Sequence, residues 1–251
     1  MMPLSSFTPP DKARMTTRLG GRLEALEAAR VGLVARRRQS SDNCLRRNTH
    51  EYWMELSRDL RHPLSEKWRQ NQDIRAPRSP RDLTEEVDLA EQARRRLGKV
   101  DSLKFDQFFH WICSVNMLTG ASGAGELRTI NVQSSADRLG RRIAFSPPDD
   151  LRRQLSLLSE ASREWEHNQS FRASLMLLGI IAIHPFADGN GRTARACFNA
   201  LLFNERPAPF VPIRMIMDCS CGGFEIRMRH AIFNGSWGEI ITYLTAALDY
   251  S

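Results

Sequence analysis

Residues 171–195 of the chain have the sequence FRASLMLLGIIAIHPFADGNGRTAR, an apolar run followed directly by a polar segment. The apolar part, Phe171 to Ile183, is apolar on nearly every side of a helix, which predicts a helix at the centre of the fold. Proline disfavours helical geometry in the residue before it, so Pro185 should end this helix at His184. A further helix is expected from Ala194 to Phe203. The sequence therefore predicts two packed helices joined by a short polar bend.

The bend carries groups that suit chemistry on phosphates. His184 can accept a proton near neutral pH, and Asp188 is a hard-oxygen carboxylate of the kind that holds Mg²⁺. Residues 189–191, Gly-Asn-Gly, can direct backbone N–H groups at an anion. Arg192 and Arg195 lie on one helix face beside its positive end, which costs stability unless an anion lies between them. A glycine-rich turn with surface arginines explains the glycines but not the whole set, so a polyphosphate site beside a proton acceptor is predicted.

The remaining pattern predicts an all-α fold, a mostly helical bundle with one small β-hairpin. Helical spacing of apolar residues is found at 17–38, around 52–60, and at 83–93, 103–117, 151–165 and 240–248. A capping box, Ser236 to Glu239, is expected to start the last of these helices. The alternation in Leu127 to Val132 predicts a strand, with Arg142 to Phe145 as its return strand.

Composition excludes several classes of protein. The 251 residues are 41% apolar and 26% charged, which rules out wholesale disorder. The longest apolar stretch, residues 175–183, is too short to span a membrane, and the first residues lack the apolar centre of a secretory signal. The five cysteines are sparse and odd in number, which favours a reducing compartment. We expect a cytoplasmic protein, in its own cell or in a host cell if it is exported as an effector.

The net charge of +7 comes entirely from the first hundred residues. These hold 21 Lys and Arg against 14 Asp and Glu, whereas residues 101–251 hold 15 of each. Arginine clusters could meet phosphates, but no aromatic residues interleave with them, so a nucleic-acid partner is not expected. We predict a basic, helical N-terminal arm at 1–80, with a loose tail at 1–15, and a catalytic domain at 81–251 with its core at 100–205.

Residues 184–195 resemble the motif of Fic-domain proteins, His-Pro-Phe-x-Asp/Glu-Gly-Asn-Gly-Arg-x-x-Arg, and every defined position matches. Upstream, residues 127–132 are similar to the flap of that family, and Phe145 to Pro148 resemble the turn that follows it. The resemblance covers residues 100–205 well and the last 45 residues loosely. The first 80 residues show no convincing similarity.

The resemblance implies a nucleotidyltransferase that moves AMP from ATP to a Ser, Thr or Tyr hydroxyl of a target protein. His184 would be the general base, and Asp188 would hold Mg²⁺. Phe186 would anchor the nucleotide loop as a buried apolar side chain. The phosphates would be held by Gly189, Asn190, Gly191, Arg192 and Arg195. An extended target segment would pair with the flap residues Leu127, Arg128, Ile130 and Val132, with Arg128 either touching the site or bracing the hairpin.

The resemblance also leaves alternatives open. Many family members carry an inhibitory helix with the motif Ser/Thr-x-x-x-Glu-Gly/Asn, whose glutamate pairs with the second arginine of the motif. No glutamate of this chain is followed by Gly or Asn. Either a small antitoxin-like partner supplies the glutamate, or the enzyme is unrestrained like a toxin, or the regulator has diverged. Rival functions are transfer of UMP, phosphocholine or phosphate, and a non-catalytic binding module. The other histidines show no ligand-like spacing (His50, His62, His110, His167 and His230).

Overall fold

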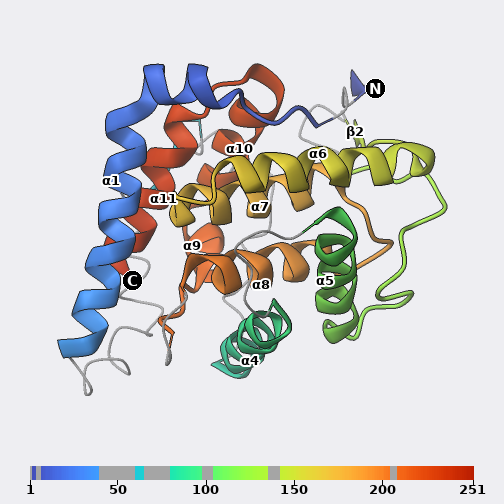
Figure 1. Ribbon diagram of the computed structural model, residues 1–251, viewed down its shortest axis with the longest axis horizontal. Coiled ribbons are helices and arrows are strands. Elements are labelled where there is room, and N and C mark those ends of the chain that lie inside the picture. The colour runs from blue at the N-terminus through green and yellow to red at the C-terminus, as the bar shows by residue number, and fades with distance from the viewer. Residues whose placement is uncertain are drawn as a thin grey trace. The chain divides into compact units, whose positions relative to one another are not determined.

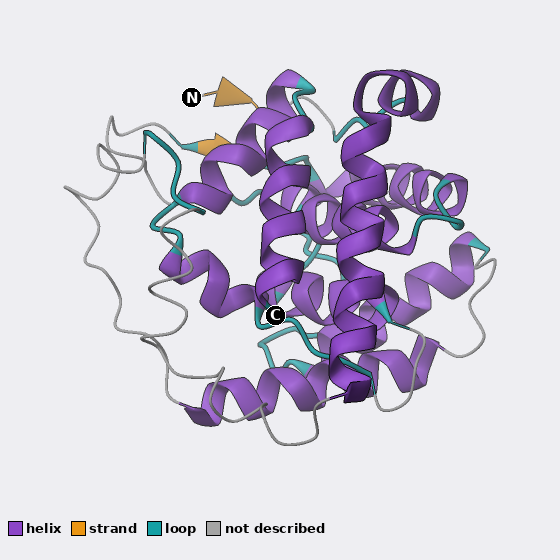
Figure 2. Cartoon of the chain, turned by 90° about the vertical axis from the view of Figure 1, so that its left-hand side faces the viewer, coloured by secondary structure: helices purple, strands orange, loops and turns teal. Residues whose placement is uncertain are grey.

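The computed structural model describes residues 2–3, 7–39, 60–64, 80–97, 104–134, 142–203 and 208–251. Within these ranges the fold is mostly helical, as predicted, with two short strands (Figure 2). The chain forms two compact units. The first unit comprises Met1–Met15 and Glu86–Leu202, and the second comprises Thr16–Glu85 and Phe203–Ser251. None of the helices in the described ranges combines the length and apolar character that a bilayer-spanning segment requires.

The first unit is built around helix α7 (Gln169–Ile183), which is buried on nearly all sides as its sequence predicts. The side chain of Asn168 caps it by accepting a hydrogen bond from the Phe171 N–H at 2.9 Å. Helix α7 packs against α6 (Leu151–Glu164) and α8 (Asn190–Leu202). Helix α5 (Phe105–Leu118) packs against both α6 and α8 and lies at one end of α8 in Figure 1. These four helices carry the polar bend between α7 and α8.

Helix α4 (Pro80–Leu97) is attached to this group of helices by hydrogen bonds. Arg94 Nη2 donates to the Asn199 carbonyl on α8 at 2.9 Å, and Trp111 Nε1 on α5 donates to the Ala93 carbonyl at 3.0 Å. Both bonds lie in buried surroundings, where an unpaired polar group is costly. The part of α4 from Glu86 onward is therefore fixed beside α5 and α8.

The predicted β-hairpin is not formed as two regular strands in the described residues. The segment at 127–134 makes isolated antiparallel bridges, Leu127 with Phe186 and Gln133 with Ala144. The named strands are instead β1 (Met2–Pro3) and β2 (Ile143–Ala144), which pair in parallel. Leu127 was expected to pair with the return strand, but it pairs with the bend after α7. A regular ladder does not form because the segment divides its pairing between two partners, and residues 135–141 lie outside the described ranges.

The second unit contains α9 (Ile213–Cys219), α10 (Gly223–Asn234), α11 (Gly238–Tyr250) and most of α1 (Lys12–Gln39). Helix α10 packs against α9 and α11. Helices α1 and α11 run side by side in Figures 1 and 2, and Arg36 Nη2 on α1 donates to the Leu248 carbonyl on α11 at 3.0 Å. The buried apolar side chains of α1 and α11 in this unit are Leu23, Leu26, Ala29, Leu33, Val34, Ile240, Ile241, Tyr243, Leu244, Ala247 and Leu248.

Several elements differ from the pattern read in the sequence. Within the segment expected to be a loose tail, Phe7 is buried, and Asp11 accepts a hydrogen bond from the Arg14 N–H at 2.7 Å at the start of α1. Helices α9 and α10 were not predicted. The capping box before α11 is wrong, since Trp237 is its N-cap and Glu239 pairs with His230 instead. Most of the helix predicted around residues 52–60 lies outside the described ranges.

Candidate active site

His184 ends helix α7 in a left-handed conformation, with φ of 53° and ψ of 56°. Non-glycine residues rarely adopt this geometry, and Pro185 excludes the helical alternative. The imidazole is stacked on the ring of Phe145, with the ring centroids 4.2 Å apart and the planes at 18°. Its Nδ1 atom is buried and makes no hydrogen bond within the described residues. The ring is thus held by packing against Phe145.

Burial lowers the pKa of His184 to about 4, and the nearby charge of Arg128 acts in the same direction. The ring is therefore neutral at pH 7. A neutral imidazole can accept a proton, whereas a protonated one cannot.

Asn190 shapes the bend from inside. Its side-chain Oδ1 accepts from the Phe186 N–H at 2.9 Å, and its Nδ2 donates to the Phe186 carbonyl at 2.8 Å. Both Asn190 and Phe186 are buried. The amide of Asn190 thus fixes the loop backbone, and the Phe186 ring anchors the loop in the core.

Asp188 and Arg192 lie at the exposed side of the same bend. Asp188 Oδ1 accepts a hydrogen bond from the Gly189 N–H at 2.6 Å, and Oδ2 lies 3.4 Å from Arg192 Nη2. The Asp188 side chain is 65% exposed. Arg192 Nη1 also donates to the Thr119 carbonyl at 2.6 Å. The carboxylate is therefore oriented by one short bond while its second oxygen remains accessible.

Gly189 makes the close approach between the bend and α5 possible. Its φ is +80°, a conformation that side chains rarely adopt. A Cβ atom at this position would lie 2.6 Å from Thr119 Oγ1 and 2.9 Å from Asn116 Nδ2. The backbone conformation and the available space both require glycine here. Gly191 lies in the first turn of α8. A Cβ atom at this position would lie 3.3 Å from Nη1 of Arg195, the end of a flexible side chain.

The side chain of Asn116 on α5 holds the bend through hydrogen bonds. This role was not predicted from the sequence. Asn116 is fully buried, and its Nδ2 donates to the Asp188 carbonyl at 3.1 Å and to Thr193 Oγ1 at 3.0 Å. Its Oδ1 accepts from the Gly125 N–H at 2.8 Å. A buried amide on the otherwise apolar face of α5 was the signal in the sequence that could have identified it.

The flap residues are placed unequally around the bend. Arg128 is buried, and its guanidinium donates to the carbonyl oxygens of His184, Ile130 and Ser146. Its backbone N–H donates to the Pro185 carbonyl at 3.0 Å. Arg128 therefore braces the bend and the flap together. The side chain of Ile130, by contrast, is 63% exposed.

Arg195 is engaged by a carboxylate from α4. Its Nε and Nη2 atoms lie 3.0 and 2.5 Å from Glu86 Oε1, and its side chain is only 8% exposed. Glu86 is followed by Val87, so it belongs to no Glu-Gly or Glu-Asn sequence. The arginine that was predicted to bind a phosphate thus forms a nearly buried ion pair in the structure, and its role toward a phosphate stays a prediction.

The segment that carries this site is similar to a known protein family. Residues 106–202, from α5 to the end of α8, match the Fic/DOC family. Residues 106–202 form a Fic/DOC family domain. The match includes the whole bend from His184 to Arg195 and the helices that support it. The part of α4 that carries Glu86 lies outside the matched range.

The chain is also similar to named relatives of this family. It is 30% identical over 131 residues to protein adenylyltransferase Fic from Drosophila ananassae, and the alignment covers 49% of this chain but only 20% of that relative. The chain thus spans about a fifth of that protein. Among solved structures, a Fic family protein from Desulfovibrio desulfuricans G20 aligns with a TM-score of 0.59 at 15% identity, covering 99% of this chain and 74% of the other.

A second solved structure shares the fold. A Fic domain containing signaling protein from Bacteroides thetaiotaomicron VPI-5482 aligns with a TM-score of 0.52 at 16% identity, covering 91% of this chain and 92% of the other. At these identities the two alignments establish the helical fold of the Fic/DOC domain in this chain.

Proposed function

We propose that this chain is a protein adenylyltransferase that transfers AMP from ATP to a hydroxyl side chain of a target protein. The observation that carries the proposal is the imidazole of His184, which is stacked on Phe145 next to the start of α8, while Arg128 donates to the backbone carbonyl of His184. Burial lowers the pKa of this imidazole, so it is neutral at pH 7. A neutral base beside a backbone anion site is the combination that hydroxyl attack on a nucleotide phosphate needs. The name of the similar Drosophila protein supports the same activity.

The start of α8 supplies the binding groups for the triphosphate. Its first N–H groups and its dipole favour an anion, and Arg192 adds a positive charge at the same end. The accessible Oδ2 atom of Asp188 suits a hard divalent cation, because its contact with Arg192 Nη2 is long, at 3.4 Å. Mg²⁺ bound there would neutralise part of the phosphate charge. Asp188 and Arg192 are then responsible for placing the α-phosphate within reach of the acceptor.

In the proposed step, the imidazole of His184 accepts the proton of the target hydroxyl. A bond forms between the hydroxyl oxygen and the α-phosphorus, and the bond from that phosphorus to the oxygen bridging to the β-phosphate breaks. Pyrophosphate leaves with the bridging oxygen. The exposed flap around Ile130 offers main-chain and apolar contacts for an extended target segment. Such contacts would hold the acceptor hydroxyl near His184.

Glu86 is proposed to restrain this activity. While its carboxylate pairs with Arg195, that guanidinium is not available to a phosphate of ATP. The chain would thus supply its own restraining glutamate from α4, without the sequence motif that marks it in related proteins. A separate inhibitory partner is then not needed.

Mass spectrometry tests which group is transferred. The purified chain carrying Glu86→Gln is incubated with lysate and Mg²⁺ in the presence of ATP, UTP or CDP-choline. We expect the mass of one AMP residue on Ser, Thr or Tyr, with ATP only. A UMP, phosphocholine or phosphate addition would instead support the corresponding rival, and no addition with any donor would favour a binding module. In the same assay His184→Ala should abolish the addition, and His110→Ala, altered at an exposed position of α5, is its matched control.

A further inference from the structure

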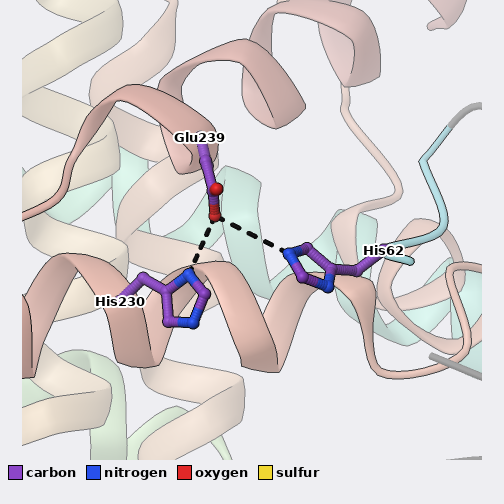
Figure 3. A group of neighbouring side chains, drawn as sticks. All are labelled: His62, His230 and Glu239. Carbon is purple, nitrogen blue, oxygen red and sulfur yellow. Dashed lines mark hydrogen bonds and ion pairs between the residues drawn. The ribbon is translucent and has the colours of Figure 1, made fainter. Parts of the chain in front are cut away.

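Three potential metal ligands converge in the second unit, although they are far apart in the sequence. His62, His230 and Glu239 come from the segment at 60–64, from α10 and from the first turn of α11 (Figure 3). His230 Nδ1 lies 2.9 Å from Glu239 Oε2, and His62 Nε2 lies 3.8 Å from the same oxygen. One ligand atom from each residue lies within 4.8 Å of the other two. The two imidazole rings face one carboxylate.

The segment that carries His62 is held in place by α10. Arg227 Nη1 donates to the Leu60 carbonyl at 2.8 Å, and its Nη2 donates to the Arg61 carbonyl at 3.3 Å. The backbone approaches so closely that a Cβ atom on Gly223 would lie 2.5 Å from the Leu60 oxygen. The backbone at Leu60 and Arg61 is therefore held against α10, and this contact places His62 beside His230.

His230 and Glu239 are also fixed by the local backbone. The C-terminal end of α10 is closed by hydrogen bonds from the N–H groups of Gly235 and Ser236 to the His230 carbonyl. Glu239 follows four residues after Gly235, in the first turn of α11. The tight connection between α10 and α11 brings the carboxylate over the imidazole. The three side chains are thus 11–47% exposed and open to solvent on one side.

We propose that His62 Nε2, His230 Nδ1 and Glu239 Oε2 bind a zinc ion, with water in the fourth position. Two imidazoles and one carboxylate are a donor set that zinc uses in proteins. Ligand atoms about 2.0–2.1 Å from a tetrahedral zinc lie about 3.3 Å from one another, so movements of about 1 Å or less complete the site. Mg²⁺ prefers oxygen ligands and would bind far more weakly. The site uses none of the residues assigned to nucleotide transfer.

Two features of the site limit its affinity. The positive charge of Arg227 lies near His62 and opposes a cation, although its guanidinium is occupied by three carbonyl oxygens. The Leu64 N–H also donates to His62 Nδ1 at 3.1 Å, and zinc at Nε2 moves the imidazole proton to Nδ1, so this bond is lost. We therefore expect micromolar rather than nanomolar binding. Bound zinc connects the segment at 60–64 to both α10 and α11 and should stabilise the folded second unit.

Zinc titration of the full chain tests the proposal. The EDTA-treated protein is titrated by competition with a chromophoric chelator, and thermal unfolding is recorded with and without ZnCl₂. We expect one zinc per chain and a rise in Tm. His62→Ala, His230→Ala and Glu239→Gln should each lower the affinity about 10-fold to 100-fold. His167→Ala is the matched control, because His167 forms a similar pair with Glu166 at 3.3 Å but belongs to no described three-ligand cluster.

Substitution by Co²⁺ keeps the proposal testable if a variant does not fold, because it uses the unaltered chain. We expect the strong visible bands of tetrahedral cobalt with nitrogen and oxygen ligands. The proposal would be overturned if the unaltered chain bound no zinc. It would also be overturned if all three ligand variants bound zinc as tightly as the unaltered chain. A sulfur-to-cobalt charge-transfer band would also overturn it, because it would place the ion on a cysteine.

Discussion

The imidazole of His184 is stacked on the ring of Phe145, with 4.2 Å between the ring centroids. This contact joins the residue at the end of α7 to the residue that follows β2. It keeps water away from one face of the imidazole, and burial is the main reason that the pKa of His184 falls to about 4. The proposed general base is therefore uncharged over the whole physiological pH range.

Replacing Phe145 should change the pH dependence of transfer. Phe145→Ala admits water to the imidazole, so the pKa of His184 should rise from about 4 toward its ordinary value of 6.5. Protonation below the pKa removes the base, so the acidic limb of the rate profile should move to higher pH. NMR titration of the His184 ring and transfer rates from pH 4 to 8 measure the two effects. An unchanged pKa in the variant would show that the stacking does not set it.

Removing the carboxylate of Glu86 should increase transfer. Glu86→Gln weakens the ion pair and frees Arg195 for a phosphate, and we expect a gain of about tenfold or more, since each 1.4 kcal/mol of lost competition is a factor of ten. The rate of AMP incorporation and the affinity for ATP are measured together. Glu85→Gln is the control, because Glu85 is exposed on the same turn of α4. Equal activity of Glu86→Gln and the unaltered chain contradicts the restraint.

Loss of the Asn116 amide should destabilise the bend. Asn116→Ala removes the acceptor of the Gly125 N–H and the donor to the Asp188 carbonyl and Thr193 Oγ1, and we expect the free energy of unfolding to fall by about 2–3 kcal/mol. Urea unfolding measures this loss. Asn131→Ala, at an exposed position, should change it by less than about 0.5 kcal/mol. A loss no larger than that of the control would show that the amide does not hold the bend.

Replacing Gly189 by alanine should impair the protein more than the same change at a glycine whose only constraint is its positive φ. Gly189→Ala combines a φ of +80° with contacts of 2.6 and 2.9 Å, whereas Gly120→Ala has a φ of +63° with no atom within 4 Å. We expect about 1 kcal/mol of destabilisation at Gly120 and a clearly larger loss, with reduced ATP binding, at Gly189. Thermal unfolding and ATP titration separate the two effects. Similar losses in both variants would contradict a steric requirement at Gly189.

The sequence predicted the parts of the fold that depend on local pattern. The apolar run at 171–183 and the proline after His184 determine α7 and its end, because both act within one helix. Helix α10 was missed because its residues have no clear apolar face, and its packing against α9 and α11 compensates. The irregular flap was missed for another reason, since pairing of Leu127 with Phe186 depends on where a distant bend lies.

The sequence also predicted which residues make up the bend, but not how distant side chains meet. The pairing of Glu86 with Arg195 and the convergence of His62 with His230 and Glu239 are contacts between segments far apart in the chain. Neither leaves a spacing pattern that can be read along the sequence. Asn116 is an intermediate case, because a buried amide in an apolar helix indicates a polar partner without identifying it.

The central claim is that His184 acts as the base for transfer of AMP from ATP to a hydroxyl. The most direct test compares His184→Ala with the unaltered chain, both in the Glu86→Gln background, for ATP affinity and for incorporation of α-labelled ATP into protein. We predict nearly unchanged ATP affinity and a loss of incorporation of at least about 100-fold. Incorporation by His184→Ala at the rate of the unaltered histidine would contradict the account.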